Sequence, residues 1–428
     1  MAFLVSHIMG LNARNHLFLS RYNSKQGKAI ADSKLLTKRF LRRHGFPHPE
    51  LYGVFRNFSD VPRFDWGSLR RNFVIKPSEG YGGDGIVIVK RRLGSEAFLS
   101  VEQEEILLDD LKLHVLDILE GNYHKYEMPD TAFIEERVPR HPAFRHYAYR
   151  GTPDVRIIVF NQVPIMAMLR LPTPGSHGKA NLHQGGLCLG VDLATGITTH
   201  GTIFDRPTLY VPVSGKKVSG LRIPQWDEML EISLAVAREV GLGYMAADFV
   251  LHSKKGPMIL ELTARPGLGI QIANRAGLQK RLERVEGLEQ AGKGKGIQIS
   301  RALFAESFAD RVLAKRGAKI IGVHELVKVK DAHGKKLEIL AKVDTGAFRS
   351  SIDRKLAKSL GLLRKGNILW QNYYYSSLGR ERRPVIELTY WLSGRRVKTA
   401  ISVSDRSKFR EKLLIGRKDL KTFLVRSE

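Results

Sequence analysis

The segment from Lys76 to Ile86 (KPSEGYGGDGI) constrains this chain most, because it leads a lysine from an apolar strand into a turn with four glycines. Glycine lets the backbone take positive φ and approach a ligand closely, the amides of such a turn can surround an anion, and the lysine adds positive charge. A second apolar strand, from Ile86 to Val89, follows in place of a helix, and no GxxxxGK[ST] string occurs. The pattern favours a β-hairpin that covers a nucleotide phosphate over a glycine-rich hairpin without a ligand.

The length and the single cysteine exclude several classes of protein. With 428 residues, of which 43% are hydrophobic, the chain can bury two or three cores. Cys188 alone cannot form a disulfide framework or a cysteine-based zinc site, and it fits a reducing compartment. The apolar first ten residues lack a basic leader, and no run is long enough to span a bilayer. We therefore expect a cytoplasmic protein.

The net charge of +27 is concentrated towards the C-terminus. Residues 311–428 contain 29 Lys and Arg against 11 Asp and Glu, and this difference of +18 is two thirds of the excess. Such a balance predicts an anionic partner, which could be an acidic peptide, an anionic membrane surface or nucleic acid. The alternative is that pairs such as Arg382-Arg383 and Arg395-Arg396 are solvated strand edges that discourage aggregation.

Periodicity divides the chain into three parts. Residues 28–45 have apolar side chains at helical spacing and predict one amphipathic helix that ends at a glycine. Short strands and helices then alternate to about residue 275, which indicates an α+β fold. The charged stretch 280–296 predicts a linker, and the segment 300–314 after it predicts a helix. A last region of alternating β-branched and polar residues predicts a small all-β domain. The expected parts are residues 1–280, 281–317 and 318–428.

Further motifs follow the glycine loop in an order that suits nucleotide chemistry. Lys34 opens the first helix and can reach phosphates, although Lys38 one turn later is an equal alternative. The strand 133–138 (FIEERV) can offer backbone groups and a carboxylate to an adenine edge. Arg156 and Arg170 could neutralise charge on a transferred phosphoryl group.

Two carboxylates on adjacent apolar strands predict a metal site. Asp248 and Glu261 lie thirteen residues apart, and Mg²⁺ prefers such oxygen ligands and takes the rest from phosphates. Each residue has a structural alternative: Asp248 could cap a turn, Glu261 could pair with Arg265, and Arg156 could be a surface residue. The joint occurrence of these residues in this order favours the nucleotide site.

With these motifs, residues 1 to about 280 resemble an ATP-grasp ligase, nearest to the α-L-glutamate ligase-like branch that is related to enzymes adding glutamates to a ribosomal protein. The resemblance implies an ATP-grasp fold, ATP with Mg²⁺ or Mn²⁺, and the ligation of a carboxylate to an amine through an acyl-phosphate. It implies roles for the following residues: Lys34, Lys76, Gly80, Gly82, Gly83 and Gly85 at the phosphates, Glu135, Glu136 and Val138 at the adenine hinge, Arg156 and Arg170 at the acyl-phosphate, Asn181 in orienting substrate and metal, and Asp248, Glu261 and Thr263 at the metal.

One position departs from that family. The family usually has Glu-x-Asn at the metal, whereas Thr263 stands here in place of the asparagine. A hydroxyl is a shorter and weaker oxygen ligand than an amide carbonyl, so we expect reduced metal affinity or turnover. The substrate implied by the resemblance is an amino acid or an acidic peptide or protein.

The C-terminal part contains a second pair of motifs. Asp344-Thr345-Gly346-Ala347 follows an apolar strand, and the string LIGR ends at Arg417 about seventy residues later. These motifs resemble a retropepsin-like aspartic protease of the family called ATP-dependent zinc protease. Catalysis of this kind needs two aspartates that share a proton, so a homodimer would supply Asp344 twice. Zinc is rejected, because this part offers only His324 and His333 as nitrogen ligands.

Two accounts of the whole chain are therefore open. In the first, the chain is a bifunctional enzyme that forms amide bonds on an anionic substrate and trims or holds the same material. In the second, the first part is an ATP-gated adaptor of weak activity, and the C-terminal part is a silent barrel that docks on an acidic protein, a membrane partner or nucleic acid. Nucleic acid is the weaker partner, because aromatics are sparse among the basic runs apart from residues 373–375.

Overall fold

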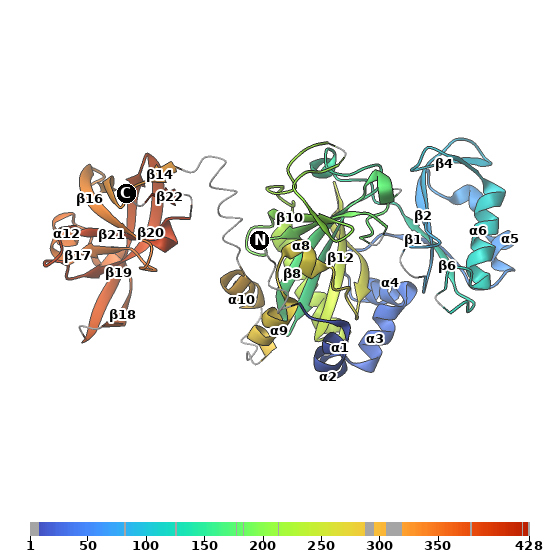
Figure 1. The fold of residues 1–428 in the computed structure, drawn as a ribbon, viewed down its shortest axis with the longest axis horizontal. Coiled ribbons are helices and arrows are strands. Elements are labelled where there is room, and N and C mark those ends of the chain that lie inside the picture. The colour runs from blue at the N-terminus through green and yellow to red at the C-terminus, as the bar shows by residue number, and fades with distance from the viewer. Residues whose placement is uncertain are drawn as a thin grey trace. The chain divides into compact units, whose positions relative to one another are not determined.

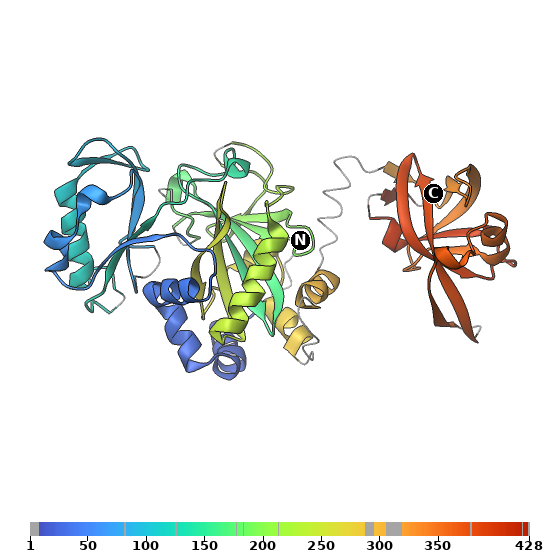
Figure 2. The same cartoon turned by 180° about the vertical axis from the view of Figure 1, so that it is seen from behind.

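The computed structural model describes residues 8–80, 83–124, 126–176, 178–182, 184–212, 214–286, 295–304, 319–376, 379–421 and 423–426. The chain divides into two compact units, Met1–Ala309 and Asp310–Glu428, which Figures 1 and 2 show from opposite sides. Each unit is described by itself. In the described ranges, no helix is both long enough and apolar enough to cross a membrane.

The glycine loop belongs to a six-stranded antiparallel sheet in the first unit, with the order β1-β6-β2-β3-β4-β5. Its strands are β1 (Leu51–Phe55), β2 (Phe73–Pro77), β3 (Val87–Arg92), β4 (Ala97–Ser100), β5 (Glu105–Leu107) and β6 (Ala132–Glu136). The strands β2 and β3 pair on either side of the loop, as the sequence predicts. Phe73 and Ile75 of β2 are fully buried in one core with Val115 and Ile118 of helix α6 (Leu108–Glu120), and the short helix α5 (Asp60–Arg63) adds Val61.

A seven-stranded sheet forms the larger part of the first unit, with the order β11-β10-β9-β8-β7-β12-β13. Its strands are β7 (Asp154–Phe160), β8 (Val163–Leu171), β9 (Leu187–Val191), β10 (Thr198–Ile203), β11 (Arg206–Thr208), β12 (Tyr244–His252) and β13 (Gly256–Thr263). Every residue of β7 is buried, because helices cover both faces of the sheet. Helix α7 (Trp226–Val240) lies over one face in Figure 2, and α8 (Ile270–Asn274) and α9 (Leu278–Glu286) lie over the other in Figure 1.

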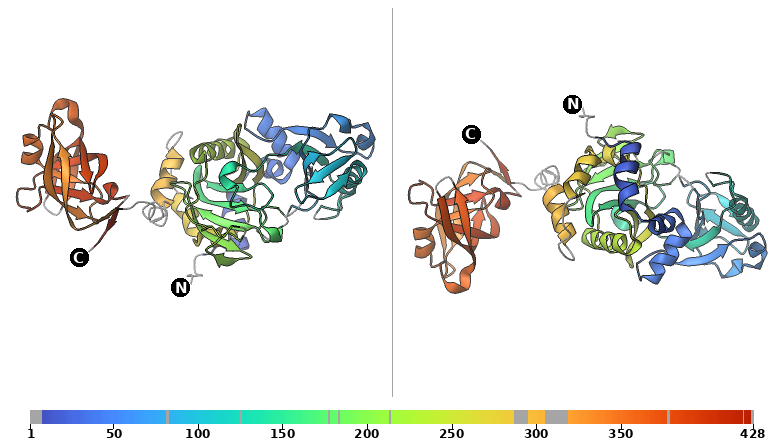
Figure 3. Two further views of the ribbon diagram at one scale, coloured as in Figure 1. Left: turned by 90° about the horizontal axis from the view of Figure 1, so that it is seen from above. Right: turned by 90° about the horizontal axis from the view of Figure 1, so that it is seen from below.

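The N-terminal helices lie beside this sheet and are blue in Figure 3. They are α1 (Leu11–Ala13), a π-helical segment (Arg14–Leu19), α2 (Ser20–Tyr22), α3 (Lys25–Asp32) and α4 (Lys34–Arg43). The single helix predicted over 28–45 is therefore two helices. Ser33 has extended φ and ψ, its hydroxyl accepts a hydrogen bond from the amide of Leu36, and it bonds the hydroxyl of Ser78 at 3.0 Å. The break makes Lys34 the first residue of α4.

The linker predicted over 280–296 also needs correction at its start. Helix α9 continues to Glu286, and its Leu282 and Val285 are fully buried in the core of the first unit. A further helix, α10 (Lys295–Phe304), places Phe304 in the same core. Within α9, Glu283 and Arg284 are exposed opposite this buried face, as in an amphipathic helix. The rest of the predicted helix 300–314 lies outside the described residues.

The second unit is a barrel. Its seven-stranded sheet has the order β15-β16-β21-β17-β20-β19-β18, and β15 also pairs with β19, which closes the sheet. The strands are β15 (His324–Lys330), β16 (Lys336–Asp344), β17 (Ser351–Asp353), β18 (Ile368–Ser376), β19 (Gly379–Leu392), β20 (Arg395–Ser404) and β21 (Leu413–Gly416). Separate strands β14 (Lys319–Ile321) and β22 (Phe423–Val425) pair in parallel. The predicted α+β fold with a C-terminal β-barrel is confirmed, and the barrel carries one short helix, α12 (Arg354–Ser359).

Candidate nucleotide and metal site

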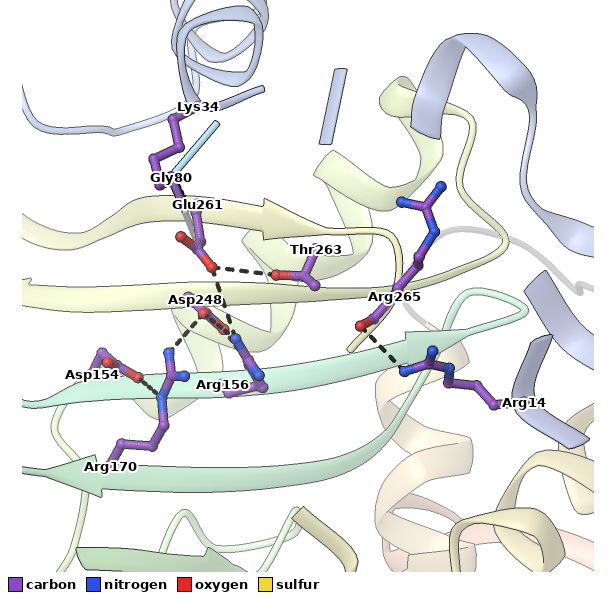
Figure 4. Close-up of polar contacts among 10 residues, drawn as sticks. All are labelled: Arg14, Lys34, Gly80, Asp154, Arg156, Arg170, Asp248, Glu261, Thr263 and Arg265. Atoms are coloured by element: carbon purple, nitrogen blue, oxygen red, sulfur yellow. Dashed lines mark hydrogen bonds and ion pairs between the residues drawn. The ribbon is translucent and has the colours of Figure 1, made fainter. Parts of the chain in front are cut away.

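The register of four neighbouring strands assembles the charged centre of the first unit. Glu261 on β13 pairs with Asp248 on β12, and Asp248 pairs with Arg156 on β7. Asp154, two residues before Arg156, pairs with Arg170 on β8. Because paired residues point to the same face of a sheet, these side chains converge on one face, as Figure 4 shows.

Asp248 is the hub of this centre. Its carboxylate accepts hydrogen bonds from Nε and Nη2 of Arg156 at 2.7 and 2.6 Å, and from Nη2 of Arg170 at 2.7 Å. Arg170 also donates from Nε to Asp154 Oδ1 at 2.5 Å. The alternatives in which Asp248 caps a turn or Arg156 is a surface residue are therefore wrong.

Burial and charge set the ionisation of these groups. The side chain of Asp248 is only 1% exposed. This burial opposes its ionisation, but Arg156 and Arg170 outweigh it, so the pKa of Asp248 is lowered. Asp154 accepts a hydrogen bond from Arg170, whereas Asp248 accepts hydrogen bonds from both Arg156 and Arg170. Burial together with the charge of Asp248 raises the pKa of Asp154 to about 7. Asp248 is therefore the carboxylate of this pair that stays ionised at pH 7.

Glu261 and Thr263 lie at the open side of the centre. The side chain of Glu261 is 35% exposed and approaches Nη2 of Arg156 at 3.9 Å. The hydroxyl of Thr263 donates to Glu261 Oε1 over a long 3.5 Å. The ion pair expected as an alternative between Glu261 and Arg265 is not formed, because the guanidinium of Arg265 bonds Asp32. Glu261 is thus open to solvent, whereas both carboxylate oxygens of Asp248 accept hydrogen bonds from arginines.

Three lysines lie beside the glycine loop, and the structure separates their surroundings. Lys38 Nζ approaches Glu135 Oε2 at 2.5 Å, and Lys76 Nζ bonds the other oxygen, Oε1. Glu135 is 1% exposed. Burial opposes its ionisation, but the two ammonium groups overcome this and lower the pKa of Glu135. The side chain of Glu135 thus holds two lysines in place, and its place at the adenine hinge stays a prediction.

Lys34 stands apart from that pair and faces the loop directly. Its ammonium group donates to the carbonyl of Gly80 at 2.8 Å and lies 3.4 Å from that of Ser78. Burial lowers the pKa of Lys34, and the charge of Glu261 opposes this shift. Lys34 therefore contacts the loop, and Figure 4 shows Lys34 and Gly80 on the side of Glu261.

The loop has the conformation for which its glycines were singled out. Gly83 and Gly85 have φ of +87° and +71°, values that side chains rarely tolerate. A Cβ atom on Gly80 would lie 2.2 Å from Cγ of Pro77. Gly82 lies outside the described residues.

The side chains of the predicted hinge residues Glu136 and Val138 contact other residues of the first unit. The carboxylate of Glu136 accepts hydrogen bonds from the amide of Glu50 at 3.2 Å and from Nζ of Lys255 at 2.6 Å. Val138 is buried beside Val250 and Met258.

Asn181 lies on the loop that precedes β9. Its backbone carbonyl accepts a hydrogen bond from the amide of Gly186 at 2.7 Å. A Cβ atom placed on Gly83 would lie 4.0 Å from Nδ2 of Asn181. The structure thus places Asn181 beside the glycine loop.

Sequence reasoning gave no role to Asp154, which positions Arg170. A signal was present, because Asp154 and Arg156 are two residues apart in a strand and therefore share a face.

Asp344 lies in the second unit at the end of β16. Its Oδ1 accepts the amides of Gly346 and Ala347 at 2.9 and 3.1 Å. The strand β21, which carries the predicted LIG string, runs parallel to β16 and pairs Gly416 with Asp344. The two motifs, which lie far apart in the sequence, are therefore side by side on adjacent strands.

The comparison with protein families matches this architecture. The profile of the family described as sugar-transfer associated ATP-grasp matches residues 13–287, which is more than half of the chain. The chain belongs to this ATP-grasp family. The predicted ATP-grasp fold is thereby confirmed, whereas the finer resemblance to the glutamate ligase-like branch stays a prediction. A search of curated proteins finds no match.

Solved structures similar to this ATP-grasp protein include two ligases and a protease. The ATP-grasp ligase PsnB, complexed with a phosphomimetic variant of minimal precursor, Mg and ADP, is 16% identical with a TM-score of 0.34, over 65% of this chain and 62% of its own. D-alanine–D-alanine ligase from Bacillus anthracis, complexed with ATP, is 12% identical with a TM-score of 0.33, over 61% and 71%. The Simian Foamy Virus protease is 18% identical with a TM-score of 0.17, over 23% and 90%. The chain thus spans less than two thirds of the length of PsnB.

The substitution Glu135→Gln should lower the free energy of unfolding by about 3–5 kcal/mol, because it leaves two buried ammonium groups without their shared carboxylate. The neighbouring Glu136→Gln is the matched control, and we expect it to cost less than about 1 kcal/mol because its partner Lys255 is half exposed. Urea unfolding at pH 7, followed by circular dichroism, measures both.

The same variant has a signature in pH. The lowered pKa of Glu135 means that its stabilisation is present above the ordinary carboxyl pKa of 4.5 and is lost as the pH falls. The difference between Glu135→Gln and the unsubstituted protein should therefore shrink below that pH. Equal losses for the two glutamine variants, or a difference independent of pH, would contradict the assignment.

Proposed function

We propose that the first unit is an ATP- and Mg²⁺-dependent ligase that phosphorylates a carboxylate and joins it to an amine. The observation that carries this proposal is that three lysines, two on α4 and one on β2, lie beside the glycine loop, while two arginines and two carboxylates converge on one face of the seven-stranded sheet. Membership of an ATP-grasp family supports the same chemistry.

The phosphates of ATP would bind between the loop and the lysines. An ammonium group has three donors, so Lys38 and Lys76 can each bond Glu135 and still donate to phosphate oxygens. Lys34 now bonds a loop carbonyl and can exchange it for a phosphate. The backbone amides of the loop would bond further phosphate oxygens.

The donor set at the strands fits Mg²⁺ or Mn²⁺. Asp248 and Glu261 offer hard carboxylate oxygens, and Thr263 can contribute a hydroxyl at the edge of the site. Among the described residues, no three His, Cys, Asp or Glu side chains gather around one point, so phosphate and water oxygens would complete the coordination. When bound, the ion would neutralise the phosphates and orient them. Asp248 must release one of its arginine contacts to take part.

The same residues suit the two chemical steps. In the first step a carboxylate oxygen attacks the γ-phosphorus of ATP, and ADP leaves. In the second step an amine nitrogen attacks the acyl carbon, phosphate leaves, and the nitrogen loses a proton. Arg156 and Arg170 would stabilise the charge that builds on the phosphoryl oxygens, and Asn181 would help to orient the substrate.

The proposed substrate is an amino acid or an acidic peptide or protein, because the net charge of +27 favours anionic partners. The second account, an ATP-gated adaptor, differs in that it predicts ATP binding without a condensed product.

A test combines turnover with product identity. The purified protein with Mg·ATP and pools of amino acids and glutamyl peptides should release ADP only when both an acid and an amine are present, and mass spectrometry should show a condensed product. Lys76→Ala should reduce this rate at least about a hundredfold, because it removes a phosphate ligand. Lys90→Ala is the control, since Lys90 is an exposed lysine on the strand after the loop.

The outcomes separate the two accounts. Full substrate-dependent turnover in Lys76→Ala would contradict the ligase site. ATP binding without turnover in any pool would favour the adaptor.

A specific observation favours a second activity in the C-terminal unit. The Asp-Thr-Gly turn and the LIG strand meet at Asp344, as a retropepsin-like aspartic protease would require. One chain supplies one such aspartate, so we propose that the unit acts as a homodimer in which two copies of Asp344 share a proton. Its substrate would be an acidic peptide.

Asp344→Asn should abolish peptide hydrolysis, because the shared proton needs two carboxyl groups. It should leave the fold unchanged, since an asparagine oxygen can still accept the amides of Gly346 and Ala347. Cleavage of acidic peptide libraries, followed by mass spectrometry at pH 4 to 7, measures the loss. Equal cleavage by the variant, or none by either protein, would favour a silent binding barrel.

A further inference from the structure

We propose that four residues on α6 and in the segment after it position the glycine loop by holding both of its ends: His114, Tyr123, His124 and Asp130. We call these residues the loop cradle. The inference rests on the proposed function, because it assigns the part of the protein that presents the loop to ATP. We call them positioning residues, because they contact the loop and would act on ATP through it.

The cradle holds the far end of the loop at Gly85. The carbonyl of Gly85 accepts a hydrogen bond from His114 Nε2 at 2.9 Å. The ring of Tyr123 lies against the same residue, since a Cβ atom on Gly85 would approach Cγ of Tyr123 to 2.6 Å. With φ of +71°, this position requires glycine for both its conformation and its contact.

The two aromatic residues also fix each other. The Tyr123 hydroxyl lies 3.3 Å from His114 Nδ1, and the ring centroids are 5.2 Å apart. Burial lowers the pKa of His114, so its imidazole is neutral at pH 7. A neutral ring that donates at Nε2 must accept at Nδ1, and this matches a carbonyl on one side and a hydroxyl on the other.

The cradle holds the near end of the loop at Glu79. The backbone amide of Glu79 donates to Oδ2 of Asp130 at 2.9 Å and lies 3.2 Å from Oδ1. His124 Nε2 lies 3.4 Å from the carboxylate of Glu79. The amide of Ser78, the residue before, donates to the carbonyl of Thr131 at 2.9 Å. Both ends of the loop are therefore bonded to one continuous stretch of chain.

Gly80, Gly83 and Asp84, the described loop residues between these ends, have other partners. Asp84 accepts a hydrogen bond from Gln184 Nε2 at 3.2 Å, and Gly83 lies beside Asn181. The carbonyl of Gly80 accepts a hydrogen bond from the ammonium group of Lys34. Of these partners, the proposed function places Lys34 at the phosphates and Asn181 at the substrate. Fixing the two ends of the loop before ATP binds lowers the ordering cost of binding.

The cradle is separable from the core of its sheet. The face of α6 that packs on the sheet consists of residues such as Leu111, Val115 and Ile118, which are fully buried. The hydrogen bond of His114 goes to the loop backbone instead. A substitution of His114 should therefore alter the loop and leave the fold in place.

The test measures the loop and ATP binding separately. In His114→Ala, backbone amides in a peptide covering residues 78–86 should exchange about three to ten times faster than in the unsubstituted protein, as expected for the loss of one hydrogen bond. The Kd for Mg·ATP, measured by calorimetry, should rise by a similar factor. His114→Gln, whose amide can donate to Gly85, should restore both values.

Two further variants keep the test decisive. Leu113→Ala is the matched control, because Leu113 is a neighbouring residue of α6 that is 59% exposed, and both values should be unchanged. Tyr123→Phe keeps the ring against Gly85 and removes only the hydroxyl, so it should fold and show an intermediate increase in exchange.

Unchanged exchange of the loop in both His114→Ala and Tyr123→Phe would overturn the cradle. So would faster exchange with an unaltered Kd for Mg·ATP. A protein that binds ATP and shows the predicted shifts but forms no amide would contradict the proposed ligase and leave the cradle standing.

Discussion

The buried carboxylate of Asp248, shared by Arg156 and Arg170, is the interaction on which the proposed site depends. A charge with 1% exposure is tolerated only when partners satisfy it, so the register of β8, β7, β12 and β13 is tied to these contacts. A shift of one residue in any of these strands would turn the charged side chains to the opposite face. The same register places Glu261 at the open side of the centre. One buried ion cluster thus ties the strand pairing to the position of the proposed metal ligands.

The six-stranded sheet also contains a buried carboxylate that is shared by two cations. Glu135 on β6 is buried between Lys38 of α4 and Lys76 of β2, so the carboxylate fixes two cations that come from separate elements. A site assembled in this way is preorganised, because its lysines and arginines need little rearrangement before they meet phosphate. The rearrangement that ATP does require is local: Asp248 must exchange an arginine contact and Lys34 a loop carbonyl. The loop cradle belongs to this scheme, since it orders the one glycine-rich segment of the site.

Sequence reasoning predicted the elements that local pattern determines. It located the strands on both sides of the glycine loop, the paired carboxylates Asp248 and Glu261, and the barrel with its Asp344 turn. It missed features that depend on contacts between distant segments. The break at Ser33 depends partly on a hydroxyl from Ser78, and the continuation of α9 depends on a core that receives Leu282. The contacts of Glu135 with two lysines join β6 to α4 and to β2, and periodicity does not reveal them.

The central claim is that this ATP-grasp unit activates a carboxylate by phosphorylation, and an isotope experiment tests it most directly. Acids labelled with ¹⁸O in the carboxylate would be incubated with the protein, Mg·ATP and an amine pool, and the released phosphate would be analysed by mass spectrometry. An acyl-phosphate pathway transfers one labelled oxygen from the acid to phosphate, so the account predicts singly labelled phosphate in proportion to the amide formed. Unlabelled phosphate accompanying ADP release would show that ATP is hydrolysed by water, and it would contradict the claim.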